Sequence, residues 1–215
     1  MIDVVIPTKS YVDGLLRVVG QLTADSGVNQ VVVVADGAKA LETMGALDLG
    51  PKAKLVAVPL GVGIHVMWNL GKDMVVRNGN HVAFINDDTT VAENCMQIVS
   101  DLLDRRPDVG LVTPNYTGNP MVEFVEMRKH GGFCMTLARD LCHEWRFDER
   151  MKWWYGDDDI QHWVSIEKQR GVGLTGLTHC GDNCSYTIGN DGPVGFHEIV
   201  ENDRIIFTEK WKGKT

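Results

Sequence analysis

The stretch His81-Val82-Ala83-Phe84-Ile85-Asn86-Asp87-Asp88-Thr89 joins a short apolar run directly to two carboxylates. The apolar part has the length and the composition of a β-strand that is buried on both faces. Side chains that follow such a strand emerge at its carboxyl end, where ligands bind in parallel sheets. A hard divalent ion such as Mg²⁺ or Mn²⁺ needs only one or two carboxylates, so Asp87 and Asp88 are candidate ligands. Because Asp and Thr also favour the start of a helix, the stretch alone leaves a metal site and a helix cap equally open.

The residues on either side of this stretch alternate between strand and helix patterns. Apolar and β-branched runs predict strands, and apolar residues at three- and four-residue spacing predict helices with one buried face. The predicted strands are Asp3–Pro7, Val31–Val34, Lys54–Val58 and His81–Ile85, and the predicted helices are Val12–Leu22, Ile64–Val75, Cys95–Leu103 and Asp158–Arg170. We expect Val31–Val34 and Lys54–Val58 to be interior strands. The alternation predicts an α/β fold with a mainly parallel sheet and helices on both of its faces.

The second half of the chain has a looser pattern, with glycine- and aromatic-rich segments after Thr113-Pro114. Gly171 is expected to end the helix that begins near Asp158. The region from Gly189 onward contains several glycines and ends in basic residues. The sequence is compatible with a flexible flap and equally with a docked tail in this region.

The composition is that of one compact globular domain. The chain has 215 residues, of which 44% are apolar and 23% charged, and this usage argues against disorder and against a fibrous structure. Its formal net charge of −8 argues against nucleic-acid binding, which needs a surface rich in lysine and arginine. An acidic chain that binds a phosphorylated ligand needs a cation to offset the repulsion, and this favours a divalent metal.

The sequence contains no signal for a membrane or an export pathway. No apolar run approaches the roughly 20 residues that cross a bilayer, and a basic segment with an apolar core is absent from the N-terminus. We therefore expect a cytoplasmic protein without a transmembrane segment. The five cysteines are odd in number and irregularly spaced, which favours reduced thiols. His179, Cys180 and Cys184 lack the second cysteine pair that a tetrahedral zinc site would need.

Short motifs follow the predicted strands and helices in a definite order. They are Val5-Ile6-Pro7-Thr8, Asp36-Gly37, Asn69-Leu70-Gly71, Phe84-Ile85-Asn86-Asp87-Asp88-Thr89, Gly131-Gly132-Phe133-Cys134, Phe147-Asp148-Glu149, Tyr155-Gly156-Asp157-Asp158-Asp159 and His179. In this order and spacing the chain resembles the family 2 glycosyltransferases of GT-A fold over most of its length. The resemblance implies a single glycosyltransferase domain over residues 1–215. It would have a nucleotide-sugar-binding half at 1–115, an acceptor-side half at 116–188 and a C-terminal flap or tail at 189–215.

The resemblance implies a role for each matching residue. Asp88 would bind Mn²⁺ or Mg²⁺ with His179, and Asp158 would be the general base, although the run of three aspartates leaves Asp157 and Asp159 open. The residues implied on the donor side are Pro7, Thr8, Asp36, Asn69, Asn86 and Asp87, and those on the acceptor side are Gly132, Trp154 and Tyr155. Asn69 is equally suited to a phosphate contact and to bracing the loop at Gly61-Val62-Gly63. The aromatic residues suit the apolar face of a sugar, and they equally suit packing in a core or lid.

The implied reaction moves a sugar from a UDP-, GDP- or dTDP-linked donor to a hydroxyl group of a glycan, protein or lipid, with inversion. The metal would stabilise the charge of the departing diphosphate, and the base would take the proton of the acceptor hydroxyl. One alternative is a degenerate, nonenzymatic module that binds a nucleotide-sugar or a carbohydrate. A nucleotidyltransferase is a weaker one, since Lys9-Ser10-Tyr11 does not form the glycine-rich, arginine-containing loop that it would need. Gly61-Val62-Gly63 also weakly suggests dinucleotide binding, but the third glycine of that motif is absent.

Overall fold

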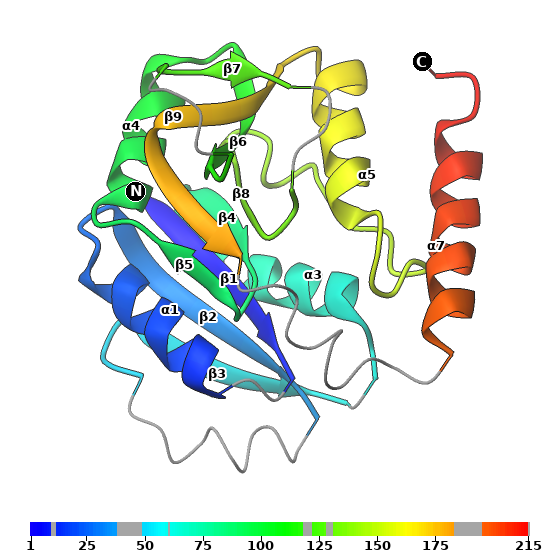
Figure 1. Cartoon of the computed structure of the whole chain (residues 1–215), viewed down its shortest axis with the longest axis horizontal. Helices are drawn as coiled ribbons and strands as arrows, with labels where there is room; N and C mark the ends of the chain where they lie inside the picture. The colour runs from blue at the N-terminus through cyan, green and yellow to red at the C-terminus, as the bar shows by residue number, and fades with distance from the viewer. Residues whose placement is uncertain are drawn as a thin grey trace.

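A nine-stranded sheet in the order β3-β2-β1-β4-β8-β6-β9-β5, with β7 paired to β9, forms the centre of the computed structural model over the residues it describes (Figure 1). The described residues are 1–9, 12–37, 49–59, 61–117, 122–127, 131–182 and 195–214. The strands are β1 Ile2–Thr8, β2 Val28–Asp36, β3 Ala53–Val58, β4 His81–Ile85, β5 Thr89–Val91, β6 Val109–Asn115, β7 Val125–Glu126, β8 Cys134–Leu137 and β9 Gly171–Asp182. The helices are α1 Val12–Ala24, α3 Ile64–Val75, η1 Val76–Asn78, α4 Cys95–Arg105, α5 Gly156–His162, η2 Trp163–Glu167 and α7 Phe196–Trp211.

The first four strands form the parallel half of the sheet. β1 pairs in parallel with β2 and β4, and β2 pairs in parallel with β3. β1 is buried along its whole length because strands flank it on both sides and helices cover both of its faces. The predicted α/β class and the predicted parallel strands are confirmed.

One prediction about these strands is wrong, because β3 is an edge strand. Most residues of β3 are half-buried, and Lys54 is exposed. An apolar run of this length also fits a strand with only one well-covered face, so the sequence pattern did not separate the two cases.

Helices cover both faces of the sheet, as predicted (Figure 1). The connection from β1 to β2 and the connection from β3 to β4 run in opposite directions along the sheet. Right-handed crossovers then place α1 and α3 on opposite faces. α1 packs against β2 and β5, whereas α3 packs against β1 and β2.

The strands after α4 add antiparallel pairings that the alternation in the first half did not predict. β8 lies between β4 and β6 and is antiparallel to both. The long strand β9 runs parallel to β6 and then pairs in antiparallel fashion with β5. Its register shifts between Pro114 and Asn115 of β6, where β9 leaves one partner for the other.

Two later segments differ from their sequence patterns. The helix expected from Asp158 begins two residues earlier as α5 and continues as the π-helix η2. Gln169, with a φ of 52°, lies in the left-handed region after η2, whereas Gly171 begins β9. The described part of the C-terminal region is a helix, α7, which docks beside α5 (Figure 1).

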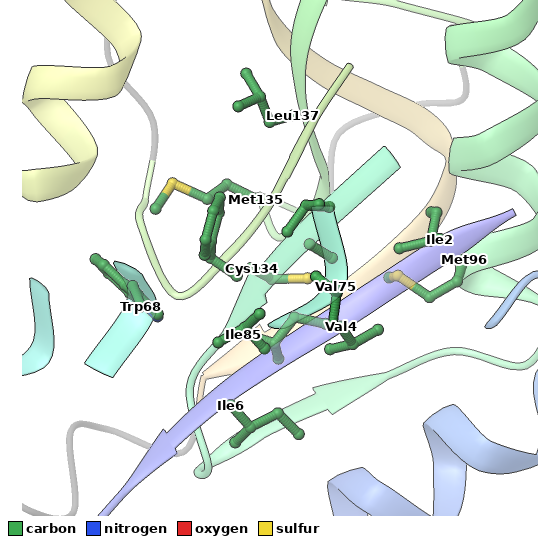
Figure 2. Close-up of a cluster of buried hydrophobic side chains, with 14 of the residues drawn as sticks. Ile2, Val4, Ile6, Trp68, Val75, Ile85, Met96, Cys134, Met135 and Leu137 are labelled. Carbon is green, nitrogen blue, oxygen red and sulfur yellow. The ribbon is translucent and has the colours of Figure 1, made fainter. Parts of the chain in front are cut away.

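The hydrophobic core lies where β1, β4 and β8 meet the helices (Figure 2). Its labelled side chains include Ile2, Val4, Ile6, Trp68, Val75, Ile85, Met96, Cys134, Met135 and Leu137. Close packing of this kind fixes β1 and β4 relative to each other, and so fixes the residues that follow them. The four cysteines in the described part of the chain are buried with free thiols, and Cys184 lies outside the described residues. None of the helices described here is long and apolar enough to span a bilayer.

Candidate active site

The carboxyl ends of β1, β2 and β4 bring together five polar residues, which we call the strand-end cluster. They are Thr8, Asp36, Asn86, Asp87 and Asp88. The three strands are neighbours and parallel, so their carboxyl ends lie at one edge of the sheet. The Thr8 hydroxyl donates a hydrogen bond of 2.6 Å to Oδ2 of Asp87, and this bond joins the ends of β1 and β4. Pro7 lies buried in β1 opposite Val34.

The Asp87 carboxyl has an unusual affinity for a proton. Its pKa is raised from 3.8 to about 7, mainly because the group is buried; the hydrogen bond from Thr8 opposes the rise and the nearby charge of Asp88 adds to it. Asp87 and Asp88 are only 6% and 5% exposed. Two buried carboxylates side by side can both ionise when a divalent cation offsets their charge.

The donor groups of the cluster fit a hard divalent cation. Besides the two carboxylates, the side-chain oxygen of Asn86 is buried and has no hydrogen-bond partner among the described residues. A buried polar atom in this state points to a missing ligand or water. Mg²⁺ and Mn²⁺ bind such oxygens and complete their coordination with phosphate oxygens and water. The described residues contain no group of three His, Cys, Asp or Glu side chains placed to hold a metal ion.

Asp36 connects the cluster to the start of α3. Its Oδ1 accepts a hydrogen bond of 2.7 Å from the backbone N–H of Gly61, and Asp36 is buried. The backbone N–H of Gly37 donates to the carbonyl of Val58 at 2.9 Å. These bonds hold the ends of β2 and β3 beside the turn at residues 61–63.

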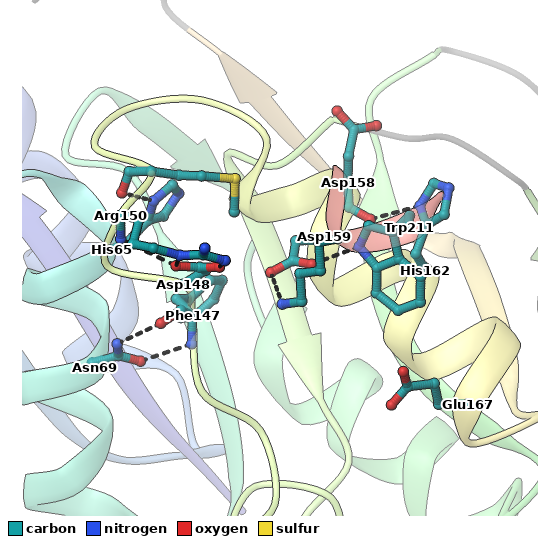
Figure 3. Close-up of polar contacts among 12 residues, drawn as sticks. His65, Asn69, Phe147, Asp148, Arg150, Asp158, Asp159, His162, Glu167 and Trp211 are labelled. Atoms are coloured by element: carbon teal, nitrogen blue, oxygen red, sulfur yellow. Dashed lines mark hydrogen bonds and ion pairs between the residues drawn. The ribbon is translucent and has the colours of Figure 1, made fainter. Parts of the chain in front are cut away.

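Asn69 makes its side-chain hydrogen bonds to the segment 147–149, and its implied phosphate contact stays a prediction. Asn69 is fully buried, and its Nδ2 donates to the carbonyl oxygen of Phe147 at 2.9 Å (Figure 3). The same nitrogen donates to Oε1 of Glu149, also at 2.9 Å. Its Oδ1 accepts the N–H of Phe147 at 2.9 Å. Asn69 therefore braces the segment 147–149. Among the described residues, these hydrogen bonds do not go to the loop at Gly61-Val62-Gly63, which Asn69 was expected to brace.

His179 lies away from Asp88. It is exposed, and its backbone carbonyl accepts the N–H of Ala92 at 3.1 Å. In the pairing of β5 with β9, Asp182 lies opposite Thr89, which directly follows Asp88. His179 precedes Asp182 by three residues in β9, which is roughly 10 Å at the usual rise of a strand. The structure does not bring these two residues together.

The glycine segment at residues 131–134 contacts the start of α5. A Cβ atom on Gly132 would lie 2.3 Å from the Cβ of Asp157. Only glycine fits at this contact. The two motifs, far apart in the sequence, therefore form one surface next to α5.

The three aspartates of α5 have different surroundings. Asp159 is fully buried, and its carboxylate accepts hydrogen bonds from Lys210 Nζ at 2.7 Å and Trp211 Nε1 at 2.8 Å (Figure 3). Burial raises the pKa of Asp159, while Lys210 opposes that rise. Asp157 and Asp158 are half-buried, and the carboxylate of Asp158 points away from the Asp159–Trp211 contact (Figure 3). The docking of α7 thus occupies Asp159 and leaves Asp157 and Asp158 as candidate bases.

The two aromatic residues before α5, Trp154 and Tyr155, both contact α7 but differ in that contact. Trp154 is 36% exposed and makes an edge contact with Phe196, with ring centroids 5.9 Å apart. Tyr155 has a φ of 64° and stacks on Phe207 at 5.3 Å. Trp154 is therefore the more exposed of the two, whereas Tyr155 is partly covered by α7.

His65 and Asp203 contact this region although the sequence did not single them out. His65 is 1% exposed, and its Nδ1 lies 2.5 Å from the carbonyl oxygen of Met151, so Nδ1 carries the proton. Burial lowers the pKa of His65, which keeps the ring neutral. Asp203 binds the backbone of residues 152–154. A histidine just after a strand-to-helix glycine turn and an aspartate within a helix carry no motif, so no sequence signal pointed to either residue.

Comparisons with known proteins identify the fold. No protein-family model matches the chain, and no curated protein matches it by sequence. Among solved structures, S. aureus TarS superposes with a TM-score of 0.69 and 14% identity over 100% of this chain and 40% of that one. GalNAc-T7, solved with UDP, GalNAc and Mn²⁺, superposes with a TM-score of 0.70 and 11% identity over 97% of this chain and 49% of that one. The chain spans less than half the length of either protein. It has the α/β GT-A fold of these two structures.

Proposed function

We propose that this chain is a metal-dependent glycosyltransferase that moves a sugar from a nucleoside-diphosphate donor to an acceptor hydroxyl with inversion. The observation that carries the proposal is the pair of buried carboxylates, Asp87 and Asp88, joined to Thr8 at the carboxyl end of the central strands. Ligands bind at this edge in open α/β sheets. GalNAc-T7, which shares the fold, was solved with UDP and Mn²⁺.

In this proposal the strand-end cluster binds the donor. Asp88 holds the divalent ion, and Asp87 and Asn86 add oxygen ligands or contacts to the diphosphate. The ion supplies positive charge that stabilises the departing diphosphate. Pro7, Thr8 and Asp36 form the surface that receives the nucleotide. UDP-, GDP- and dTDP-linked sugars all present the diphosphate that this cluster would bind.

The acceptor half of the site is the surface formed by residues 131–134 and the start of α5. Asp158 is the general base in this proposal, with Asp157 as the second candidate. A carboxylate in contact with the acceptor hydroxyl takes its proton as the new glycosidic bond forms. One displacement step of this kind inverts the anomeric carbon and needs no covalent intermediate. Gly132, Trp154 and Tyr155 line the approach of the acceptor.

The proposal assigns residues 1–115 to the donor and residues 116–188 to the acceptor. The acceptor hydroxyl belongs to a glycan, protein or lipid. The proposal gives no donor contact to Asn69, because Asn69 braces residues 147–149. It gives no metal contact to His179, because His179 is three residues away in β9 from the position that pairs with Thr89, next to Asp88.

Two carboxylate variants test the division of roles. We expect Asp88→Asn to weaken the Mn²⁺-dependent binding of a nucleotide-sugar, because it removes a charged metal ligand. We expect Asp158→Asn to keep donor binding and to slow transfer by about 100- to 10,000-fold, the usual contribution of a general base. Calorimetry with UDP-, GDP- and dTDP-sugars measures binding, and NMR of the product measures transfer and inversion. Chelation with EDTA should abolish both.

The exposed Asp101 on α4 provides the control, since Asp101→Asn removes a surface carboxylate that belongs neither to the strand-end cluster nor to α5. Transfer that is unchanged in both Asp88→Asn and Asp158→Asn would refute the assignment. Metal-dependent donor binding without any transfer by the wild type would instead identify a nonenzymatic binding module.

A further inference from the structure

Helix α7 holds the segment that leads into the candidate base. Asp203, in the middle of α7, is fully buried. Its carboxylate accepts hydrogen bonds from three consecutive backbone N–H groups, those of Lys152, Trp153 and Trp154, at 2.9 to 3.0 Å. A buried carboxylate that receives several N–H groups forms strong, charge-assisted bonds.

The start of α3 holds the same segment from the other side. The carbonyl oxygen of Lys152 accepts the N–H of Ile64 at 2.8 Å. Gly63, with a φ of 90°, lies so close that a Cβ atom there would be 2.7 Å from that oxygen. His65 binds the carbonyl of Met151. Residues 151–154, which we call the strap, are therefore fixed between α3 and α7.

The strap sets the geometry of the proposed acceptor site. It is followed by Tyr155, whose left-handed backbone is costly for a residue with a side chain and persists only where its surroundings fix it. The stacking of Tyr155 on Phe207 supplies one such contact from α7. Asp159, bound by Lys210 and Trp211, anchors the far side of the turn. Asp157 and Asp158 lie between these anchors, and Trp154 is the last residue of the strap.

We propose that Asp203 is a positioning residue, which acts through the strap to place Trp154 and the base at the start of α5 for the acceptor. This inference rests on the proposed glycosyltransferase function. Among the described residues, the hydrogen bonds of the Asp203 carboxylate go to the strap and none goes to the strand-end cluster, so its loss should affect the acceptor side selectively. Removing the carboxylate leaves three backbone N–H groups without their acceptor, and the strap then shifts or loosens.

The variants Asp203→Asn and Asp203→Ala test the proposal by kinetics. An amide keeps one acceptor oxygen and loses the charge, so Asp203→Asn should be intermediate and Asp203→Ala more severe. We expect kcat/KM for the acceptor to fall by up to about 100-fold, the effect of a misplacement of roughly 1 Å. Donor affinity measured by calorimetry with Mn²⁺ should not change. Glu201→Gln is the control, because Glu201 is exposed on the same helix and pairs only with Arg204 among its described contacts.

Hydrogen exchange measured by NMR tests the strap without any need for turnover. The amides of Trp153 and Trp154 should exchange faster in Asp203→Asn than in the wild type, whereas amides of β1 should keep their protection. If the wild type transfers no sugar, the proposed function fails, and this exchange result still decides whether Asp203 holds the strap. The inference is overturned if exchange at residues 152–154 is unchanged, or if donor affinity falls as much as acceptor kcat/KM. Should Asp203→Ala fail to fold, Asp203→Asn decides by the same criteria.

Discussion

At the scale of single residues, Asp87 shows how a member of the strand-end cluster can oppose stability. Burial and the charge of Asp88 disfavour its ionised form, and its pKa of about 7 exceeds the value of 3.8 for a free carboxyl. The folded chain therefore binds this proton more tightly than the unfolded chain does. Such a group stabilises the fold fully below about pH 4, and its contribution is lost as the pH rises to about 7.

The first prediction concerns this pH dependence in the metal-free chain. Asp87→Asn removes the titrating group, so the variant should lose less stability between about pH 5 and pH 8 than the wild type. At the higher pH it should be more stable than the wild type by up to about 4 kcal/mol, since the shift spans about three units at ~1.4 kcal/mol each. Urea unfolding in EDTA at the two pH values measures this difference. The surface variant Asp101→Asn should follow the wild type, and an identical slope for Asp87→Asn would contradict the argument.

The second prediction distinguishes the two roles considered for Asn69. Asn69→Ala leaves the N–H and the carbonyl of Phe147 without their partners in a buried site. We expect a loss of about 2–4 kcal/mol in the free energy of unfolding, with donor affinity unchanged at temperatures where the variant is folded. Urea unfolding and calorimetry measure the two quantities. A fall in donor affinity with normal stability would instead support the phosphate contact.

At the scale of elements, the short turn before α3 links the strand-end cluster to the strap. In the turn before α3, the N–H of Gly61 donates a hydrogen bond to Asp36, and Gly63 packs closely against Lys152 of the strap. This explains Gly61-Val62-Gly63 without a dinucleotide, because its glycines serve backbone contacts within the chain. The π-helix η2 continues α5 toward β9, so the segment with the candidate base is fixed at both ends.

The third prediction compares these two glycines. Both have positive φ, 78° for Gly61 and 90° for Gly63, so alanine at either position costs about 1–3 kcal/mol of backbone strain. A Cβ on Gly61 meets nothing within 4 Å, whereas one on Gly63 meets the carbonyl oxygen of Lys152 at 2.7 Å. Gly63→Ala should therefore be less stable than Gly61→Ala by a further ~1–3 kcal/mol in thermal or urea unfolding. Equal stabilities would show that the strap does not press against this turn.

At the scale of the whole molecule, the sheet order decides which residues meet. β1, β2 and β4 come from three separate parts of the first half of the chain, yet they are neighbours and parallel. Their carboxyl ends therefore form one edge. The antiparallel strand β8 ends the parallel series, and the segments that follow it place α5 and α7 side by side (Figure 1). The molecule thus holds a cluster of carboxylate and amide side chains and an aspartate-rich helix start on a scaffold shared with much longer proteins.

The sequence by itself determined the α/β class, the first parallel strands and the residues of the strand-end cluster. Apolar periodicity reports which faces are buried, and polar residues directly after a buried strand must emerge at its end. These are local properties, so Asp87 and Asp88 were identified without a structure.

Only the tertiary structure decided the rest, because it depends on which distant segments touch. The three aspartates of α5 look equivalent in sequence, and the docking of Lys210 and Trp211 separates Asp159 from its neighbours. In the same way, only the structure shows that Asn69 forms hydrogen bonds with Phe147. The register of β9 against β5 likewise decides the separation of His179 from Asp88. Burial and hydrogen-bond partners from remote parts of the chain determine the role of a polar side chain, and sequence spacing does not record them.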